Sequence, residues 1–205
     1  MAKLSSAHKE GEVLSRRGFI KCATLAATAV SFPSVALASQ ERTVSTVSGP
    51  ELVATGNERV LAFRHLHTGE TLRLTYWSNG QYLDESLSEI NHLLRDFRTG
   101  ERYKMDRELM DLLYRLQVST GNNRAFEIIS GYRSPKTNAM LRTGSSGVAK
   151  KSLHMQGQAI DVRLPGTDLK HLHRAALEAK AGGVGLYTGS NFLHLDTGRV
   201  RNWGK

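Results

Sequence analysis

Three polar residues, His154, Asp161 and His194, stand where the surrounding pattern of strands calls for apolar side chains. Two neutral imidazoles and one carboxylate form a ligand set suited to Zn²⁺, and three protein ligands leave a fourth position for water, as in catalytic zinc sites. A zinc-bound water has a pKa of about 7, so such a site supplies hydroxide at neutral pH. The chemistry indicated is hydrolysis. The alternative is that both histidines are hydrogen-bonded core residues and that Asp161 belongs to a turn or cap.

The first two of these residues lie seven positions apart, in the run S-L-H-M-Q-G-Q-A-I-D over 152–161. On one straight strand an odd separation would point their side chains to opposite faces. Gly157 permits a tight turn between them, and the small Ala159 permits close backbone packing before the next strand. We therefore expect His154 and Asp161 to converge across a turn, with His194 arriving from a strand near the C-terminus.

Several segments must position these side chains. Alternating or short apolar runs predict strands at 60–66, 71–77, 125–130, 184–187 and 192–195. Helical spacing or capping signals predict helices over 87–97, from 106 to 116, from 135 onward and over 168–181, with a surface loop over 142–152. Because strands and helices are mixed without regular alternation, we expect a single α+β domain with helices packed on an antiparallel sheet.

Residue types at three helix starts support these assignments. Ser86 and Glu89 are spaced as a capping box for the first helix, and Asp106 is placed to cap the second. Ser134 precedes Pro135, and proline is favoured at the first helical position.

The N-terminal part of the chain has the three components of an export signal in order. Residues 1–38 contain a polar stretch with Arg16-Arg17 followed by Gly-Phe-Ile-Lys, an apolar run over 22–32, and Ala-Leu-Ala before Ser39. Paired arginines in this setting indicate a twin-arginine export signal with cleavage after position 38. The apolar run is shorter than the roughly 20 residues that span a bilayer, so we expect no stable membrane insertion after cleavage.

The sequence therefore predicts a linker over 39–58 and one domain over 59–205, located in the periplasm or cell envelope. The only cysteine, Cys22, falls within the predicted leader. The mature domain is then expected to contain neither a disulfide nor a cysteine nucleophile.

The run S-x-H-x-x-G-x-A-x-D at 152–161, with S-G-Y-R-S at 130–134, G-G-V-G-L-Y at 182–187 and F-L-H-L-D at 192–196, resembles the M15 zinc peptidases. Within them it is most similar to the twin-arginine-exported murein endopeptidases of the domain-of-unknown-function 882 group. The resemblance covers about residues 60–203. It implies a hedgehog/D-alanyl-D-alanine peptidase-like fold, a zinc ion held by His154, Asp161 and His194, and peptidoglycan stem peptides as substrate.

The resemblance also points to an arginine and a general base. Arg133 matches an arginine that M15 relatives place beside the site, where it would stabilise a tetrahedral oxyanion; the alternative is a surface residue paired with a carboxylate. Many M15 enzymes carry a glutamate three residues before the last ligand or a histidine two before it, but here these positions are Asn191 and Phe192. Asp196 is then either the base or the acceptor that fixes the tautomer of His194.

These observations predict a zinc-dependent murein endopeptidase that hydrolyses cross-links between stem peptides. The chain has 28 Lys and Arg against 19 Asp and Glu, which suits an anionic polymer, and an exported chain without an aromatic or helix-turn-helix signature is not expected to bind nucleic acid. The alternatives are a D-alanyl-D-alanine carboxypeptidase and a non-catalytic, zinc-containing wall-binding module that lacks a base.

Three aromatic residues either line the peptide cleft or belong to the core: Tyr132, Tyr187 and Trp203.

Overall fold

A computed structural model describes residues 57–144 and 147–204 of the chain. The expected leader over 1–38 lies outside the described residues, as does the expected linker over 39–58 up to position 56. The last residue of that linker, Glu58, is instead the first residue of strand β1. The described part belongs to one compact unit, Gly49–Lys205. In this part of the chain, no helix combines the length and the hydrophobicity needed to span a membrane.

The eight strands of the described residues form one sheet in the order β3-β2-β1-β4-β5-β7-β6-β8. Five of the seven neighbouring pairs are antiparallel, whereas β1 with β4 and β6 with β8 are parallel. The expected α+β fold is confirmed, with a sheet that is mostly antiparallel. The strands are β1 Glu58–His65, β2 Thr71–Ser78, β3 Gln81–Tyr82, β4 Phe126–Ser130, β5 Ala159–Arg163, β6 Gly183–Tyr187, β7 Phe192–Asp196 and β8 Arg201–Gly204.

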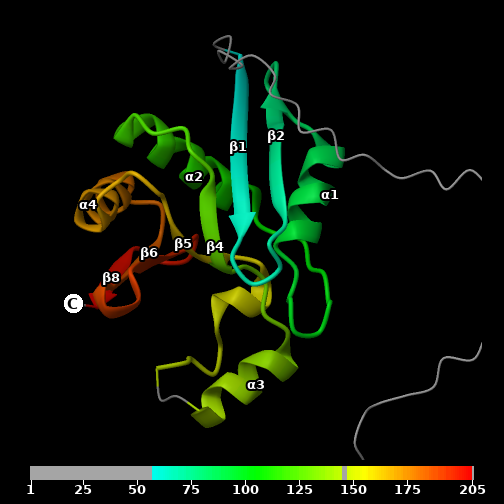
Figure 1. The fold of residues 1–205 in the computed structure, drawn as a ribbon, viewed down its shortest axis with the longest axis vertical. Helices are drawn as coiled ribbons and strands as arrows, with labels where there is room; N and C mark the ends of the chain where they lie inside the picture. The colour runs from blue at the N-terminus through cyan, green and yellow to red at the C-terminus, as the bar shows by residue number, and fades with distance from the viewer. Residues whose placement is uncertain (1–56, 145–146, 205) are drawn as a thin grey trace, which may run out of the picture. The chain divides into compact units, whose positions relative to one another are not determined.

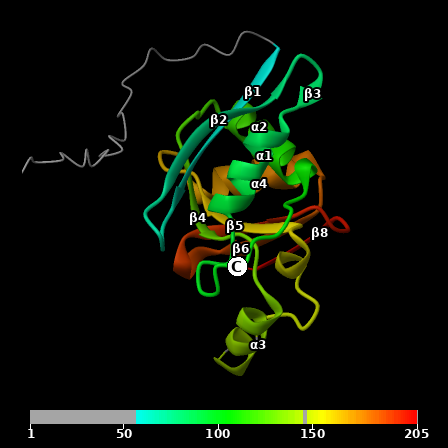
Figure 2. The same ribbon diagram turned by 90° about the vertical axis from the view of Figure 1, so that its right-hand side faces the viewer.

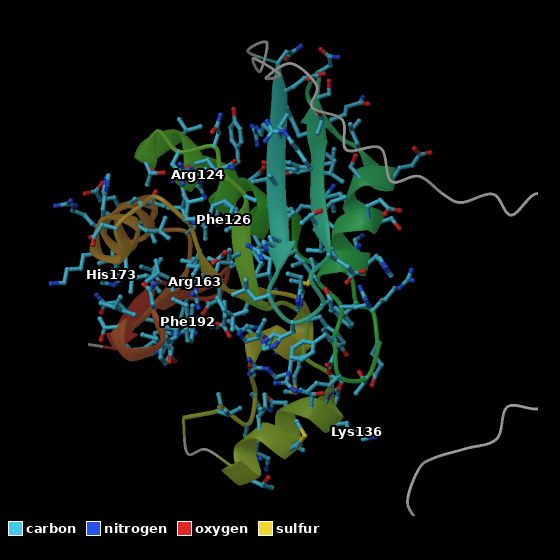
Figure 3. All side chains as sticks on the ribbon, in the orientation of Figure 1. Arg124, Phe126, Lys136, Arg163, His173 and Phe192 are labelled. Carbon is cyan, nitrogen blue, oxygen red and sulfur yellow. The ribbon has the colours of Figure 1, made fainter. Side chains whose placement is uncertain are left out.

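Of the four α-helices in residues 57–144 and 147–204, three pack on the sheet and share one hydrophobic core with it. Helix α1 contacts β2, α2 contacts β1 and α4, and α4 contacts β6 and β7. The third helix, α3, projects from the rest of the domain in both ribbon views (Figures 1 and 2), and Figure 3 shows Lys136 on it, far from Phe192 of β7. The helices are α1 Asp84–Leu93, α2 Arg107–Thr120, α3 Pro135–Gly144 and α4 Leu169–Ala179, with short 3₁₀ turns η1 Leu153–Gln156 and η2 Thr188–Ser190.

Alternation along the central strands separates the core from the polar residues. Ile160 and Val162 of β5, and Leu193 and Leu195 of β7, are fully buried in the core. Successive side chains of a strand point to opposite faces. Asp161 and the histidine between the two leucines therefore lie together on the other face of the sheet.

Two predicted helix caps are confirmed. The Asp106 side chain accepts a hydrogen bond from the Glu108 backbone N–H, at the start of α2. At the start of α3 the Ser134 hydroxyl accepts from the Thr137 N–H. Both side chains satisfy a backbone donor that the first turn of a helix leaves without an intrahelical partner.

The predicted capping box of α1 is wrong. The helix begins at Asp84 after Leu83, which makes no side-chain cap, so Ser86 and Glu89 lie inside the helix. Acidic residues at the first two positions, where the helix dipole favours negative charge, account for this earlier start.

Other boundaries also differ from the prediction. Helix α1 ends at Leu93, before the expected 97, and α2 continues past 116 to Thr120. Helix α4 ends at Ala179 because Lys180 adopts a left-handed conformation. The expected surface loop over 142–152 is shorter, since α3 continues to Gly144 and Ser152 is buried; positions 145 and 146 lie outside the described residues. Strand β8 was not expected.

A buried carboxylate ties α3 to the segment that follows α1. Asp96 is 1% exposed and accepts hydrogen bonds of 2.9 Å from the backbone N–H groups of Ser134 and Arg98. Burial alone would raise its pKa, but hydrogen bonds from Thr137, Ser134 and Arg98 outweigh this and lower the pKa to about 2. The ionised carboxylate therefore stabilises the turn between β4 and α3.

This anchor should make stability depend on pH. Because the pKa of Asp96 is lower in the folded state than in the unfolded chain, its contribution is present above about pH 4 and is lost as pH falls towards 2. We expect Asp96→Asn to lower the free energy of unfolding by about 2 kcal/mol at pH 7, with the difference from the parent shrinking between pH 4 and 2. Urea unfolding followed by circular dichroism at several pH values measures this.

The matched control is Glu89→Gln on the exposed face of α1, which should stay within about 0.5 kcal/mol of the parent. A loss of stability in Asp96→Asn that is equally large at pH 2 and pH 7 would contradict the electrostatic origin of the effect.

Candidate metal centre

The structure brings together His154, Asp161 and His194. His194 Nδ1 lies 2.9 Å from Asp161 Oδ1 and 3.2 Å from His154 Nε2, and His154 Nε2 lies 3.3 Å from Asp161 Oδ1. Tetrahedral Zn²⁺ with bonds of about 2.0 Å holds its ligand atoms roughly 3.3 Å apart. The three atoms are thus spaced as three corners of a zinc tetrahedron, and this donor set suits that ion.

Strand pairing and one turn produce this arrangement. Asp161 of β5 lies directly opposite His194 of β7 in the antiparallel ladder. His154 comes from η1, and Gly157 ends this turn in a left-handed conformation with φ of 67°. A Cβ at Gly157 would lie 2.4 Å from the Lys104 carbonyl oxygen, so the turn requires glycine. The predicted convergence across Gly157 is confirmed, although His154 lies on a 3₁₀ turn.

Each imidazole is held by a hydrogen bond on its outer nitrogen. His154 Nδ1 lies 2.8 Å from the Gly131 carbonyl oxygen, which can only accept, so Nδ1 carries the proton and Nε2 faces the cluster with its lone pair. His194 Nε2 lies 3.1 Å from Asp196 Oδ2, which leaves Nδ1 for the cluster. Carbonyl and carboxylate acceptors of this kind orient histidine ligands in metalloproteins.

The electrostatics of the cluster favour positive charge at its centre. Burial alone would raise the pKa of Asp161, but His154 and His194 lower it well below its usual range. Burial alone would lower the pKa of His194, whereas hydrogen bonds and charge from Asp161 and Asp196 raise it above its usual value. Burial lowers the pKa of His154, which favours the neutral ring that a metal needs. A divalent cation bound between these three side chains would supply the positive charge that the cluster favours.

Asp196 is fully buried and has many donors around it. It accepts hydrogen bonds from the backbone N–H groups of Gly183 and Gly198, both at 2.9 Å, and from Arg201 at 2.7 and 3.0 Å, in addition to its contact with His194. Burial alone would raise the pKa of Asp196, yet these donors lower it far below its ordinary value. A carboxylate with its lone pairs engaged in this way is a poor proton acceptor.

Arg133 lies beside the cluster. Its side chain is 12% exposed, and Nη2 is 3.5 Å from Asp161 Oδ2 and 3.3 Å from Ser130 Oγ. Nε is buried and has no hydrogen-bond partner among the described residues. The side chain is therefore not an exposed surface group, and it lines the cavity next to the three candidate ligand atoms.

A cavity of about 410 Å³ reaches all three candidate ligands, so the fourth coordination position can face solvent and substrate. Residues 147–149 and 151–153 form part of its lining, and Tyr187, Phe192 and Trp203 form another part. Tyr132 does not line this cavity; it is 7% exposed and stacks on Tyr103 with ring centroids 5.0 Å apart. Two of the three aromatic residues singled out in the sequence thus reach the cavity.

Arg201 is a site residue that the sequence reasoning missed. It comes from β8, whose four residues are too few for a periodic pattern, and this strand pairs in parallel with β6. The glycines of β6 were the available signal, because small residues in a strand mark a close approach by another group.

Comparison with known proteins identifies the family. The sequence model of the family described as peptidoglycan L,D-endopeptidase MepK matches residues 53–203. The chain is 44% identical over 151 residues to the peptidoglycan L,D-endopeptidase MepK of Escherichia coli strain K12, covering 74% of this chain and 83% of that protein. It is 42% identical over 153 residues to the probable peptidoglycan L,D-endopeptidase MepK of Haemophilus influenzae, covering 74% and 82%. No solved structure matches. The chain therefore belongs to the MepK family of M15 peptidases.

Proposed function

We propose that this protein is a zinc-dependent endopeptidase that hydrolyses the L,D bond of peptidoglycan cross-links between stem peptides. The observation that carries the proposal is the tetrahedral spacing of the donor atoms of His154, Asp161 and His194 at the base of an open cavity. The relatives at 42–44% identity, which are named as L,D-endopeptidases, support the choice of bond.

A zinc ion held by these three residues would supply a Lewis acid and a hydroxide source at neutral pH. Arg133 is placed to donate hydrogen bonds to the oxyanion that forms when the scissile carbonyl becomes tetrahedral, since it lines the cavity beside Asp161. Asp196 holds His194 in the required tautomer and is itself held by Arg201. We assign Asp196 this orienting role because its lone pairs are already engaged.

The location of the protein follows from its proposed substrate. We propose that residues 1–38 are a twin-arginine signal peptide, that 39–57 form a linker, and that the domain, whose first strand begins at Glu58, acts in the periplasm or cell envelope. Membership of the domain-of-unknown-function 882 group is part of the same proposal. A metalloprotein gains from export in the folded state, because its metal is then chosen in the cytoplasm.

The decisive experiment is digestion of defined muropeptides by the purified protein with zinc and with a chelator. Dimers joined by an L,D bond should be converted to monomers, and chelation should abolish the conversion. Chromatography with mass spectrometry separates the alternatives. Release of terminal D-alanine would indicate a carboxypeptidase, cleavage of D,D-linked dimers alone would contradict the L,D assignment, and binding without turnover would indicate a wall-binding module.

The orienting role of Asp196 predicts a defect in metal binding. Asp196→Asn weakens the acceptor of the His194 N–H, so zinc affinity should fall by about 10–100-fold, with activity falling alongside it. Asp161→Ala should lose zinc and activity together. Competition titration with a zinc indicator measures the affinity. Full zinc affinity in an inactive Asp196→Asn protein would instead assign Asp196 as the general base.

Oxyanion stabilisation by Arg133 predicts a loss of rate with retention of metal. Arg133→Met should lower kcat by about 10²–10³-fold and leave the zinc content unchanged, and Arg133→Lys should recover part of the rate. Arg142→Met, on the exposed side of α3, is the matched control and should behave as the parent. Unchanged kcat in Arg133→Met would remove Arg133 from the mechanism.

A further inference from the structure

Strand β6 has glycine at both positions that lie beside the metal centre. Gly185 lies opposite His194 of β7 on one side and beside Trp203 of β8 on the other. Gly183 is paired in the same way with Arg201. The residues of β8 are therefore separated from β7 by a strand that has no side chains at these positions.

The absence of side chains on β6 lets β8 reach across it. A Cβ at Gly183 would lie 2.4 Å from Arg201 Nη1, and a Cβ at Gly185 would lie 2.6–2.8 Å from three atoms of the Trp203 indole. Both distances are shorter than any normal carbon contact. Arg201 and Trp203 thus occupy the space that side chains on β6 would otherwise fill.

These two side chains serve different partners. Arg201 crosses β6 to make its paired hydrogen bonds with Asp196, which accounts for its position. Trp203 crosses the same strand and brings its ring to 5.2 Å from the His194 ring, centroid to centroid. Its indole Nε1 donates a hydrogen bond to the Tyr187 hydroxyl oxygen, at 3.1 Å. Trp203 is thus held at its edge while its ring lines the cavity.

We propose that Trp203 is a substrate-positioning residue whose indole forms the wall on which the peptide residue next to the scissile bond packs. This inference rests on the proposed peptidase function. The Arg201 guanidinium lies 4.9 Å from the indole centroid and supports the ring from within the same strand. A large, rigid and partly exposed aromatic surface beside a metal ligand offers contact area at low conformational cost.

The rest of the lining indicates what kind of peptide segment fits. Besides the ligand Asp161, the charged residues that line the cavity in the described part of the chain are Arg133, Lys151 and Arg201, all cationic. An aromatic wall in a cationic cavity suits a segment whose side chain has an aliphatic stem and carries a free carboxylate. The stem would pack on the indole and the carboxylate would face Lys151.

The kinetic test compares two variants that remove the wall by different routes. Trp203→Ala deletes the indole, and Gly185→Ala displaces it by adding a Cβ where the ring lies. Both should raise KM for an L,D-linked muropeptide dimer by about tenfold, with a smaller change in kcat and an unchanged zinc content. Trp203→Phe should restore most of the binding. The matched control is Gly189→Ala on η2, where an added Cβ meets no atom within 4 Å, and it should keep the parent KM.

A binding measurement tests the wall without turnover. The chain has two tryptophans, so Trp77→Phe leaves Trp203 as the sole indole fluorophore. In the chelated Trp77→Phe protein, adding the dimer should change the tryptophan emission. Such a response supports the wall even where the parent hydrolyses no cross-link, an outcome that would contradict only the proposed activity. Unresponsive emission, or parent KM in both Trp203→Ala and Gly185→Ala, overturns the wall and leaves the proposed hydrolysis standing.

Discussion

The architecture of the site depends on one cross-strand pair, Asp161 of β5 opposite His194 of β7. Their neighbours along both strands are fully buried apolar residues on the core face, so a slip of one residue in this register would bury two polar groups and expose the core. The hydrophobic effect, acting on residues with no chemical role, thereby sets the separation of two candidate ligand atoms. His154 is the one member of the cluster that lies on a turn, and the left-handed conformation of Gly157 ends that turn.

Two arginines stabilise the charged groups around this pair. Two buried carboxylates on either side of one imidazole would repel each other unless cations balanced them. Arg201 neutralises Asp196 through two short hydrogen bonds, and Arg133 lies next to Asp161 at a longer distance. The two carboxylates therefore differ in their surroundings. Both oxygens of Asp196 accept hydrogen bonds from its donors, whereas Asp161 Oδ1 faces the two imidazoles. Glycines on β6 are the structural condition for the contact between Arg201 and Asp196.

Local patterns in the sequence were sufficient to predict much of this arrangement. Polar residues that interrupt apolar strands marked Asp161 and His194, and the glycine between His154 and Asp161 predicted their convergence. Caps with a short-range mechanism, such as Asp106, were also predictable. Strand β8 was not, because its four residues gain their structure from pairing with β6, and Arg201 acquires its role only through that distant contact. The start of α1 differs for a local reason, because acidic residues at positions 84 and 85 favour a helix start before the expected capping box.

The absence of an acidic or imidazole group at Asn191 and Phe192 has a consequence for proton transfer. Asp196 is engaged by four partners, and Asp161 is the only carboxylate among the described residues that line the cavity. A strong separate base is needed when the attacking water has a high pKa, but a zinc-bound water with a pKa of about 7 is already half ionised near neutrality. A zinc ion held by His154, Asp161 and His194 would therefore supply the activated water itself, with Asp196 orienting the His194 ring. In this mechanism Arg133 stabilises the negative charge that develops on the carbonyl oxygen of the substrate.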